Sequence, residues 1–335
     1  MGSESRNRYL LKNTLIFTLG NIGSRMISFF LIPLYTNVLT TSQYGTVDLI
    51  TTISTVAGPM LTLNIAESVM RFGLDKDADK EKNTQCGSIV LFIAMIIGLI
   101  LIPICRCITE VSDYAMYVYF YVISLSASQL FLCDLRGKEL LLKYSLGNIL
   151  QTLMIAILNI TFLLVFKMET GGYLLAYIIA NFIVAIYAII AGKGYKAFSF
   201  HNIDRCKLKE MIRYSVVLIP NTFMWWIMNS SDRVMVTYMI GAAANGIYAV
   251  SYKLPTLVST LTGIFNQAWS YSAIREEGTS DETEYNNKMF KTLSAIAFMM
   301  GIGLLLLTKP FLGVYVADSY YDAWKYTPFL IIGCV

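Results

Sequence analysis

Long runs of apolar residues limit what this chain can fold into more than any other feature. The clearest run, IVLFIAMIIGLILIPIC at residues 89–105, carries no charge. Apolar stretches of about 18 or more residues are typical of helices that cross a bilayer. A globular core can bury one such run, but a hydropathy reading finds about ten of them here. The sequence therefore predicts an all-α fold, a polytopic bundle of transmembrane helices.

The composition argues against several other classes of protein. Of 335 residues, 56% are hydrophobic and 14% are charged, whereas about a quarter of the residues in a soluble chain are charged. There is no basic stripe for a nucleic acid, and the six cysteines lack zinc spacing. His201, the only histidine, falls in a predicted loop without catalytic partners. We expect no enzyme activity, no metal site, no cofactor and no nucleic-acid partner.

The distribution of Lys and Arg orients the predicted helices. The expected spans are residues 13–39, 45–72, 86–105, 114–133, 144–166, 173–192, 211–240, 246–271 and 289–307, and a last one from about 322 to 335. Only Arg106, Lys167, Lys309 and Lys325 fall on the face opposite the N-terminus. Because cytoplasmic loops are enriched in Lys and Arg, we predict a cytoplasmic N-terminus. Arg6, Arg8 and Lys12 lead directly into a full-length span, so no cleavable signal peptide is expected.

Two parts of the chain share one layout. In residues 11–73 and again in 207–272, two apolar segments flank a short uncharged turn, and placing Gly45 on Gly246 aligns them. Many transporters are built from such repeats, with the substrate site between the halves. We predict two lobes forming a V: an N-terminal six-helix lobe at 1–192, a cytoplasmic linker at 193–210, and a C-terminal lobe at 211–335. The second lobe is expected to be truncated, with about four helices present.

Polar residues at helical spacing form stripes on four predicted helices, two in each repeat. The stripes are Thr14, Thr18, Asn21, Arg25 and Ser28; Asp48, Thr52, Thr55 and Thr62; Thr222, Trp226, Asn229, Arg233 and Thr237; and Lys253, Thr256, Thr260, Gln267 and Ser270. Such stripes face a neighbouring helix or a water-filled cavity. For the neutral residues both interpretations stay open, because hydroxyl and amide groups also join helices. We predict a polar cavity lining of Thr18, Asn21, Thr222, Trp226, Asn229 and Gln267.

Charges inside the apolar segments are the strongest candidates for function. Arg25 and Arg233 each need an anion, either a protein carboxylate such as Asp48 or an anionic substrate. Lys253 lies nearer the outer surface, where its head group could also reach water. Asp232 is either a tie between helices or a site for a cation or proton.

Two further patterns concern the ends and bends of these helices. Glu67 and Arg71 are one turn apart, so a local ion pair is expected. Pro33, Pro59 and Pro220, together with Pro255, fall inside the four striped helices and predict kinks in them.

Two segments resemble a known family. They are LIPLYTNVLTTSQYGTVDLI at residues 31–50 and YSVVLIPNTFMWWIMNSSDRVMVTYMIGAAANGIYAVSYKLP at 214–255. The second, with Ser231-Asp232-Arg233 and Gly246-Ile247-Tyr248, is the more specific. The chain is similar to bacterial lipid-linked oligosaccharide (O-antigen and polysaccharide) flippases, the polysaccharide-transporter branch of the multidrug/oligosaccharidyl-lipid/polysaccharide exporter superfamily.

The resemblance implies a function and a location. It implies a transporter of the bacterial cytoplasmic (inner) membrane that flips an undecaprenyl-pyrophosphate-linked oligosaccharide to the outer leaflet for surface polysaccharide biosynthesis, by alternating access. Its partners would be that lipid-linked oligosaccharide, membrane lipids, a polysaccharide polymerase and glycosyltransferases.

The same resemblance implies roles for individual residues. Arg25, Arg233 and Lys253 would bind the pyrophosphate head group, because an Arg in a wet cavity can neutralise it. Asn21, Asn229 and Trp226 would face the sugar, and Asp48 or Asp232 would couple the motion to an ion.

Two alternatives stay open. A multidrug cation antiporter of the same superfamily would favour carboxylates over arginines in its site. A non-transporting membrane scaffold of a polysaccharide-synthesis complex would use the buried charges only as ties between helices. A membrane glycosyltransferase fits least, since no loop carries a compact acidic metal-binding motif.

Overall fold

Helices make up all the secondary structure that can be described. The computed structural model describes residue 27 and residues 29–75, 77–106, 111–198, 203–276 and 282–334. The α-helices are α2 Ile32–Val38, α3 Thr41–Leu61, α4 Ile65–Gly73, α5 Lys80–Cys105, α6 Ala115–Gly137, α7 Leu141–Ile160, α8 Glu169–Ala191, α9 Arg205–Met239, α10 Ala242–Ser251, α11 Lys253–Glu276, α12 Glu282–Tyr315 and α13 Thr327–Cys334. Short 3₁₀ or π turns lie at Ser112–Tyr114, Thr161–Val165, Gly194–Phe198 and Asp318–Lys325.

The lengths and hydropathies of these helices are those of a multi-pass membrane protein. Within the described residues, α5, α6, α7, α8 and α12 contribute five segments long and apolar enough to cross a bilayer. The bent pair α3 and α4 makes a sixth if it is counted as one span. Helices α9 and α11 are not in this set, because the polar stripes predicted from the sequence lower their hydropathy. The predicted all-α transmembrane bundle is confirmed.

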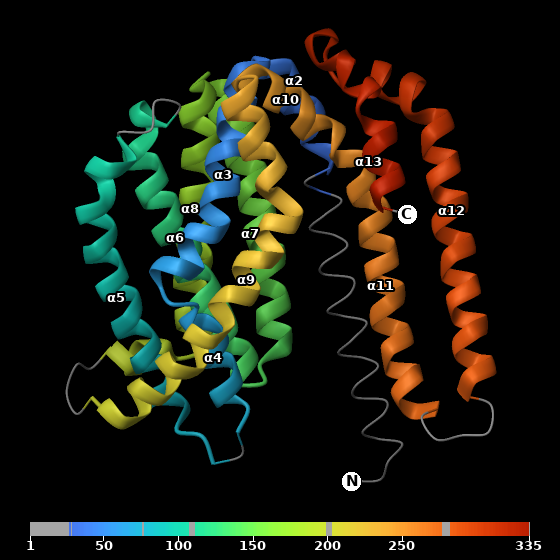
Figure 1. The fold of residues 1–335 in the computed structure, drawn as a ribbon. Helices are drawn as coiled ribbons and strands as arrows, with labels where there is room; N and C mark the ends of the chain where they lie inside the picture. Colours follow the sequence, from blue (N-terminus) through green and yellow to red (C-terminus); the bar gives the residue numbers. More distant parts are fainter. Residues whose placement is uncertain are drawn as a thin grey trace.

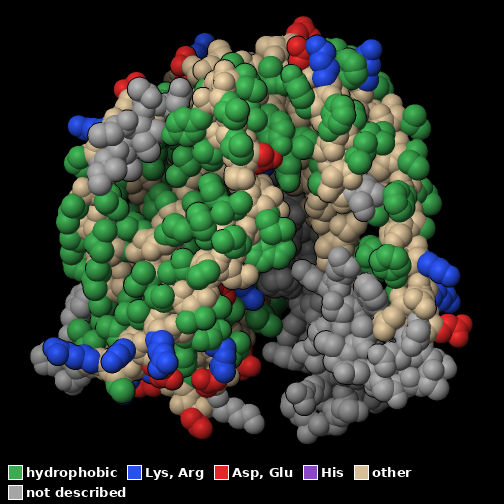
Figure 2. All heavy atoms as spheres, viewed as in Figure 1, with side chains coloured by type: hydrophobic (Ala, Val, Ile, Leu, Met, Phe, Trp, Pro, Cys, Tyr) green, Lys and Arg blue, Asp and Glu red, His purple; other side chains and the backbone are tan. Residues whose placement is uncertain are grey.

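The helices form two groups that meet at one end (Figure 1). Helices α3 to α9 make one group, while α11 and α12 lie side by side in the other, and α2 and α10 lie at the end where the groups meet. Figure 2 shows the surface hollowed between the two groups. The predicted boundary at 193–210 assigns α9 to the second lobe by sequence, whereas its contacts in space are with α3, α4 and α5 as well as α10.

The striped span that the sequence predicted as one helix at residues 45–72 is broken. Helices α3 and α4 meet at 60° across residues 62–64. Pro59 lacks an amide N–H and interferes with continuation of the helix. Leu63 and Asn64 then take the left-handed conformation, with φ of 52° and 53°, which ends α3. The chain therefore changes direction at Thr62, the last residue of the polar stripe.

The striped span predicted at residues 246–271 is broken too, near Pro255, where a kink was predicted. Helix α10 ends at Ser251 and α11 begins at Lys253. Because Pro255 has no N–H, it cannot bond the carbonyl of Ser251 four residues earlier. That carbonyl instead accepts from the Thr327 hydroxyl of α13, at 3.3 Å. The break brings Tyr252 and Lys253 to the junction of α10 and α11.

Further along the chain, two predicted boundaries shift. The span expected at residues 289–307 is longer and runs over Glu282–Tyr315, and the helix expected from about residue 322 begins at Thr327, after a 3₁₀ turn at Asp318–Lys325. A 3₁₀ turn is common at a helix terminus and is not separable from an α-helix by hydropathy.

Candidate functional site

The site lies under a close crossing of α3 and α10. Thr40 caps α3 in a capping box with Gln43, which starts the helix just above the crossing. A Cβ atom on Gly45 would lie 1.8 Å from the carbonyl oxygen of Ala242, and one on Gly246 would lie 2.0 Å from that of Thr41. Only glycine therefore fits at either position. The sequence alignment of Gly45 with Gly246 thus corresponds to a pseudo-symmetric contact in space.

Below the crossing, Asp48 of α3 and Arg233 of α9 form an ion pair. Arg233 Nη1 lies 3.1 Å from Asp48 Oδ1, and the two side chains are only 18% and 7% exposed. Asp48 lies seven residues into α3, so the pair is about 10 Å below the start of that helix at 1.5 Å per residue. A buried charge of this kind requires a partner. Of the two partners that the sequence left open for Arg233, a protein carboxylate or an anionic substrate, the structure shows the carboxylate of Asp48.

Helix α10 completes the surroundings of the ion pair. Asn245 donates its amide to the Gly45 carbonyl at 2.9 Å and to Asp48 Oδ2 at 3.4 Å. The Arg233 guanidinium carbon lies 5.1 Å from the ring centre of Tyr252, within the range of a cation–π contact. Three helices thus converge on one carboxylate and one guanidinium.

The two cationic side chains at this place, Arg233 and Lys253, can each form a further interaction with an anion. Arg233 Nε is buried and has no hydrogen-bond partner among the described residues. Lys253 interacts electrostatically with both Asp48 and Arg233, yet within the described part of the chain no ion pair engages its ammonium group. Since Asp48 is already bonded to Arg233 and Asn245, an additional anion would be stabilised here.

Asp232 faces a different partner. Its carboxylate accepts a very short hydrogen bond from the Tyr248 hydroxyl and a 2.9 Å bond from the backbone amide of Arg233. Asp232 therefore links α9 to α10 and does not pair with the guanidinium of its neighbour. This geometry agrees with the tie between helices that was one of two interpretations of the sequence.

Lower on α9, the stripe residues face α3 and α4. Trp226 Nε1 donates to the Thr52 carbonyl at 2.9 Å, and its ring stacks on Phe223 with centres 6.2 Å apart. Thr222 accepts from the Asn64 amide at 3.3 Å. These contacts join α9 to α3 and α4, while Asn229 is exposed and donates to the Trp225 carbonyl at 2.7 Å.

Several predicted residues cannot be placed. Thr18, Asn21 and Arg25 lie outside the described residues, as does the side chain of Gln267. The structure brings together Asp48, Arg233 and Lys253, and it separates this cluster from Trp226 and Thr222, which lie nearer the start of α9. The expected Glu67–Arg71 ion pair is wrong, because Arg71 pairs at 2.6 Å with Asp75, which lies one turn on in the opposite direction.

Sequence reasoning missed the contribution of α10. Asn245, Tyr248 and Tyr252 are spaced by three and four residues and so share one helical face. That spacing was visible in the sequence. Tyrosine and asparagine close to a predicted turn, however, are ordinary at the end of a membrane helix, so the pattern did not stand out.

Comparison with known proteins identifies the family of the chain. The family model of polysaccharide biosynthesis proteins matches residues 10–271. No curated protein sequence matches the chain. A crystal structure of a mutant of the Vibrio cholerae MATE transporter VcmN is similar with a TM-score of 0.60 and 13% identity, over 98% of this chain and 81% of that one.

Two other solved structures are similar. The bent form of VcmN matches with a TM-score of 0.52 and 11% identity, over 95% of this chain and 78% of that one. An inward-facing multidrug resistance MATE family transporter of the MOP superfamily matches with a TM-score of 0.56 and 12% identity, over 95% and 82%. At these identities the likeness concerns the fold alone.

Proposed function

The chain belongs to the family of polysaccharide biosynthesis proteins, and on that premise we propose that it moves an undecaprenyl-pyrophosphate-linked oligosaccharide from the cytoplasmic to the outer leaflet. Family and fold are those of membrane transporters. The observation that carries the proposal is the cluster of Arg233 and Lys253 around Asp48, which leaves buried cationic groups available to an anion.

A pyrophosphate is the kind of anion that this cluster suits. It carries at least two negative charges and cannot cross about 30 Å of hydrocarbon unneutralised. Arg233 and Lys253 together offer two positive charges, and a guanidinium can bind phosphate oxygens through two parallel N–H groups. The lipid chain would stay in the bilayer, and the glycan would occupy the hollow between the helix groups. Arg25, which the sequence predicts in the same stripe pattern, is a further candidate for this head-group site.

Movement of the lipid between the two leaflets requires that the contact between α3 and helices α9 and α10 be broken. In the present arrangement, Asp48 holds α9 and α10 against α3 at the end where the groups meet. A pyrophosphate bound to Arg233 and Lys253 would compete with Asp48 for the same positive charge and so weaken this contact. Substrate binding and opening to the outside would then be linked, as alternating access requires.

The competing candidate is a multidrug cation antiporter, and the solved multidrug MATE transporter gives it support at the level of fold. A site for a cationic drug needs uncompensated carboxylates. Here Asp48 is paired with Arg233 and Asp232 is bonded to Tyr248. Among the described residues no ion pair engages the ammonium of Lys253, and this positive charge would repel a cation.

The same proposal includes a location and partners. Figure 2 shows Lys and Arg gathered along the lower edge of the α3–α9 group. This supports a cytoplasmic lower face, with the N-terminus on that side, in a bacterial cytoplasmic membrane. A polysaccharide polymerase and glycosyltransferases would act next to the transporter, because the lipid-linked glycan must be made before flipping and joined afterwards.

The test is a flipping assay with the purified protein in vesicles. A fluorescent lipid-pyrophosphate oligosaccharide is placed in one leaflet, and its appearance in the other is timed. We expect transfer by the wild type and at least a tenfold slower transfer by Arg233→Gln. Efflux of a cationic dye without lipid transfer would instead establish the antiporter, and neither activity would favour the scaffold.

A further inference from the structure

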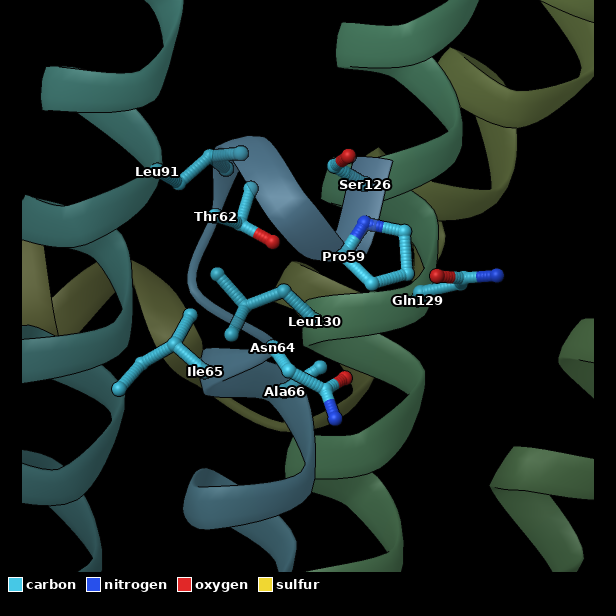
Figure 3. A pocket seen from close by; sticks show the side chains of 9 residues that line it. All are labelled: Pro59, Thr62, Asn64, Ile65, Ala66, Leu91, Ser126, Gln129 and Leu130. Carbon is cyan, nitrogen blue, oxygen red and sulfur yellow. The ribbon is translucent and has the colours of Figure 1, made fainter. Parts of the chain in front are cut away.

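The break between α3 and α4 contains a small polar cavity away from the charge cluster. It is lined by Pro59 and Thr62 at the end of α3, by Asn64, Ile65 and Ala66 at the start of α4, by Leu91 of α5, and by Ser126, Gln129 and Leu130 of α6. Figure 3 shows these side chains around the break, with α6 closing one side. The cavity volume is about 10 Å³, which is room for about one water molecule.

Ser126 is the unusual member of this lining. It is 5% exposed, and its hydroxyl has no hydrogen-bond partner among the described residues. Its neighbours on α6 behave differently, since Ser124 Oγ donates to the Tyr121 carbonyl and Ser128 Oγ to the Leu125 carbonyl. A buried hydroxyl without a partner loses its hydration with nothing in return, so a ligand that bonds to it would be stabilised.

The hydroxyl of Ser126 lies against the end of α3. A Cβ atom on Gly58 would lie 2.9 Å from Ser126 Oγ. Across the cavity, no backbone or capping hydrogen bond engages the amide of Ala66 in the described part of the chain. The hydroxyls and amides already in use are Thr62, which donates to the Gly58 carbonyl at 2.8 Å, and Asn64, which donates to Thr222.

The electrostatics of the break favour a neutral ligand. The carboxyl end of α3 and the amino end of α4 both point into it, so their opposite partial charges offset each other. None of the nine lining residues carries a formal charge. An ion would therefore gain little here, whereas a molecule that both donates and accepts can satisfy the hydroxyl and an open amide together.

We propose that an ordered water molecule occupies this cavity and bridges Ser126 Oγ to the backbone at the start of α4. The water replaces hydrogen bonds that the break removes from the span. It makes the junction between α3, which carries Asp48, and α4 a hydrated break in the span. Waters at such sites form two to four hydrogen bonds to groups that otherwise lack partners.

Radiolytic hydroxyl-radical footprinting of the full protein in nanodiscs tests this directly, because a bound water generates radicals next to side chains that bulk water does not reach. Leu130 and Ile65 line the cavity and are 2% and 1% exposed, while Leu135 and Leu174 are equally buried elsewhere at 0%. We expect Leu130 and Ile65 to be oxidised at least threefold faster than Leu135 and Leu174. That excess should disappear in Ser126→Ala and persist in the matched control Ser128→Ala.

Two results would overturn the proposal. Equal oxidation of all four residues in the wild type would mean a dry cavity. A wild-type Tm that rises with sodium chloride but not with choline chloride, together with a Tm of Ser126→Ala that responds to neither salt, would mean that a cation occupies the cavity. A cryo-EM map of the wild type that resolves other buried waters gives a readout that does not depend on any variant. It should show a peak within hydrogen-bond distance of Ser126 Oγ, and an empty cavity there would contradict the proposal.

Discussion

Gly45 of α3 and Gly246 of α10 cross so closely that each backbone occupies the space where a side chain of the other would begin. The clashes that a Cβ would create are reciprocal, 1.8 Å to Ala242 O and 2.0 Å to Thr41 O. We predict that Gly45→Ala and Gly246→Ala each separate α3 from α10. Because Asp48 lies three residues beyond Gly45, both variants should lose most transport and unfold at a lower temperature than the wild type.

The matched control for these variants is Gly303→Ala in α12. A Cβ there meets nothing within 4 Å, and alanine is favoured over glycine in a helix by about 1 kcal/mol. Gly303→Ala should therefore keep or raise the Tm and keep the flipping rate. If Gly45→Ala behaves like Gly303→Ala, the close crossing does not exist in the protein.

Removing both partners of the Asp48–Arg233 pair should cost less stability than the sum of the two single removals. A buried charge left alone costs about 3 to 5 kcal/mol. We expect Asp48→Asn and Arg233→Gln each to destabilise the protein, and the double variant to be less destabilised than the sum. Reversible unfolding in mixed micelles measures the coupling.

The exposed pair Arg71–Asp75, with side chains 52% and 48% exposed, provides the comparison for this cycle. Exposed pairs contribute about 0 to 1 kcal/mol, so Asp75→Asn should be close to neutral. Additive losses at Asp48 and Arg233 would show that the two side chains do not interact.

Substitution of Lys253 should affect transport without affecting stability. Because its ammonium has no ion-pair partner among the described residues, Lys253→Gln should change the Tm little while slowing lipid flipping at least tenfold. The control is Lys291→Gln, which removes an exposed lysine from α12 and should change neither quantity. A large fall in Tm for Lys253→Gln would indicate a structural role instead.

Trp226 tests whether α9 is held against α3. Trp226→Phe removes the donor to the Thr52 carbonyl and keeps an aromatic ring against Phe223, so the expected loss is about 1 kcal/mol of stability. The neighbouring Trp225 is 59% exposed, and Trp225→Phe should be neutral in the same unfolding measurement. Equal effects of the two substitutions would contradict the contact.

The sequence was informative where one physical force dominates. Apolar runs predicted the spans, and the repeat placed Gly45 on Gly246, which proved to be a contact in space. Depth in an apolar segment predicted that Arg233 needs an anion, and in the structure its ion-pair partner is Asp48.

Other features depend on packing that no local pattern encodes. The 60° break at residues 62–64 was not predicted, because Leu63 has little intrinsic preference for a left-handed conformation and Pro59 alone indicates only a kink. The packing of α9 against α4 joins segments far apart in the sequence, such as Ser68 Oγ and the Met211 carbonyl at 2.8 Å. Glu67 and Asp75 both lie four residues from Arg71, so helical spacing alone could not predict that Arg71 pairs with Asp75.

The most direct test of the central claim is binding of the lipid pyrophosphate itself. Native mass spectrometry would titrate undecaprenyl pyrophosphate and uncharged undecaprenol against the wild type, Lys253→Gln and Lys291→Gln. The account predicts that the wild type and Lys291→Gln prefer the pyrophosphate, and that Lys253→Gln loses at least tenfold of that preference while still binding undecaprenol. An unchanged preference in Lys253→Gln would contradict the claim that this cluster holds the head group.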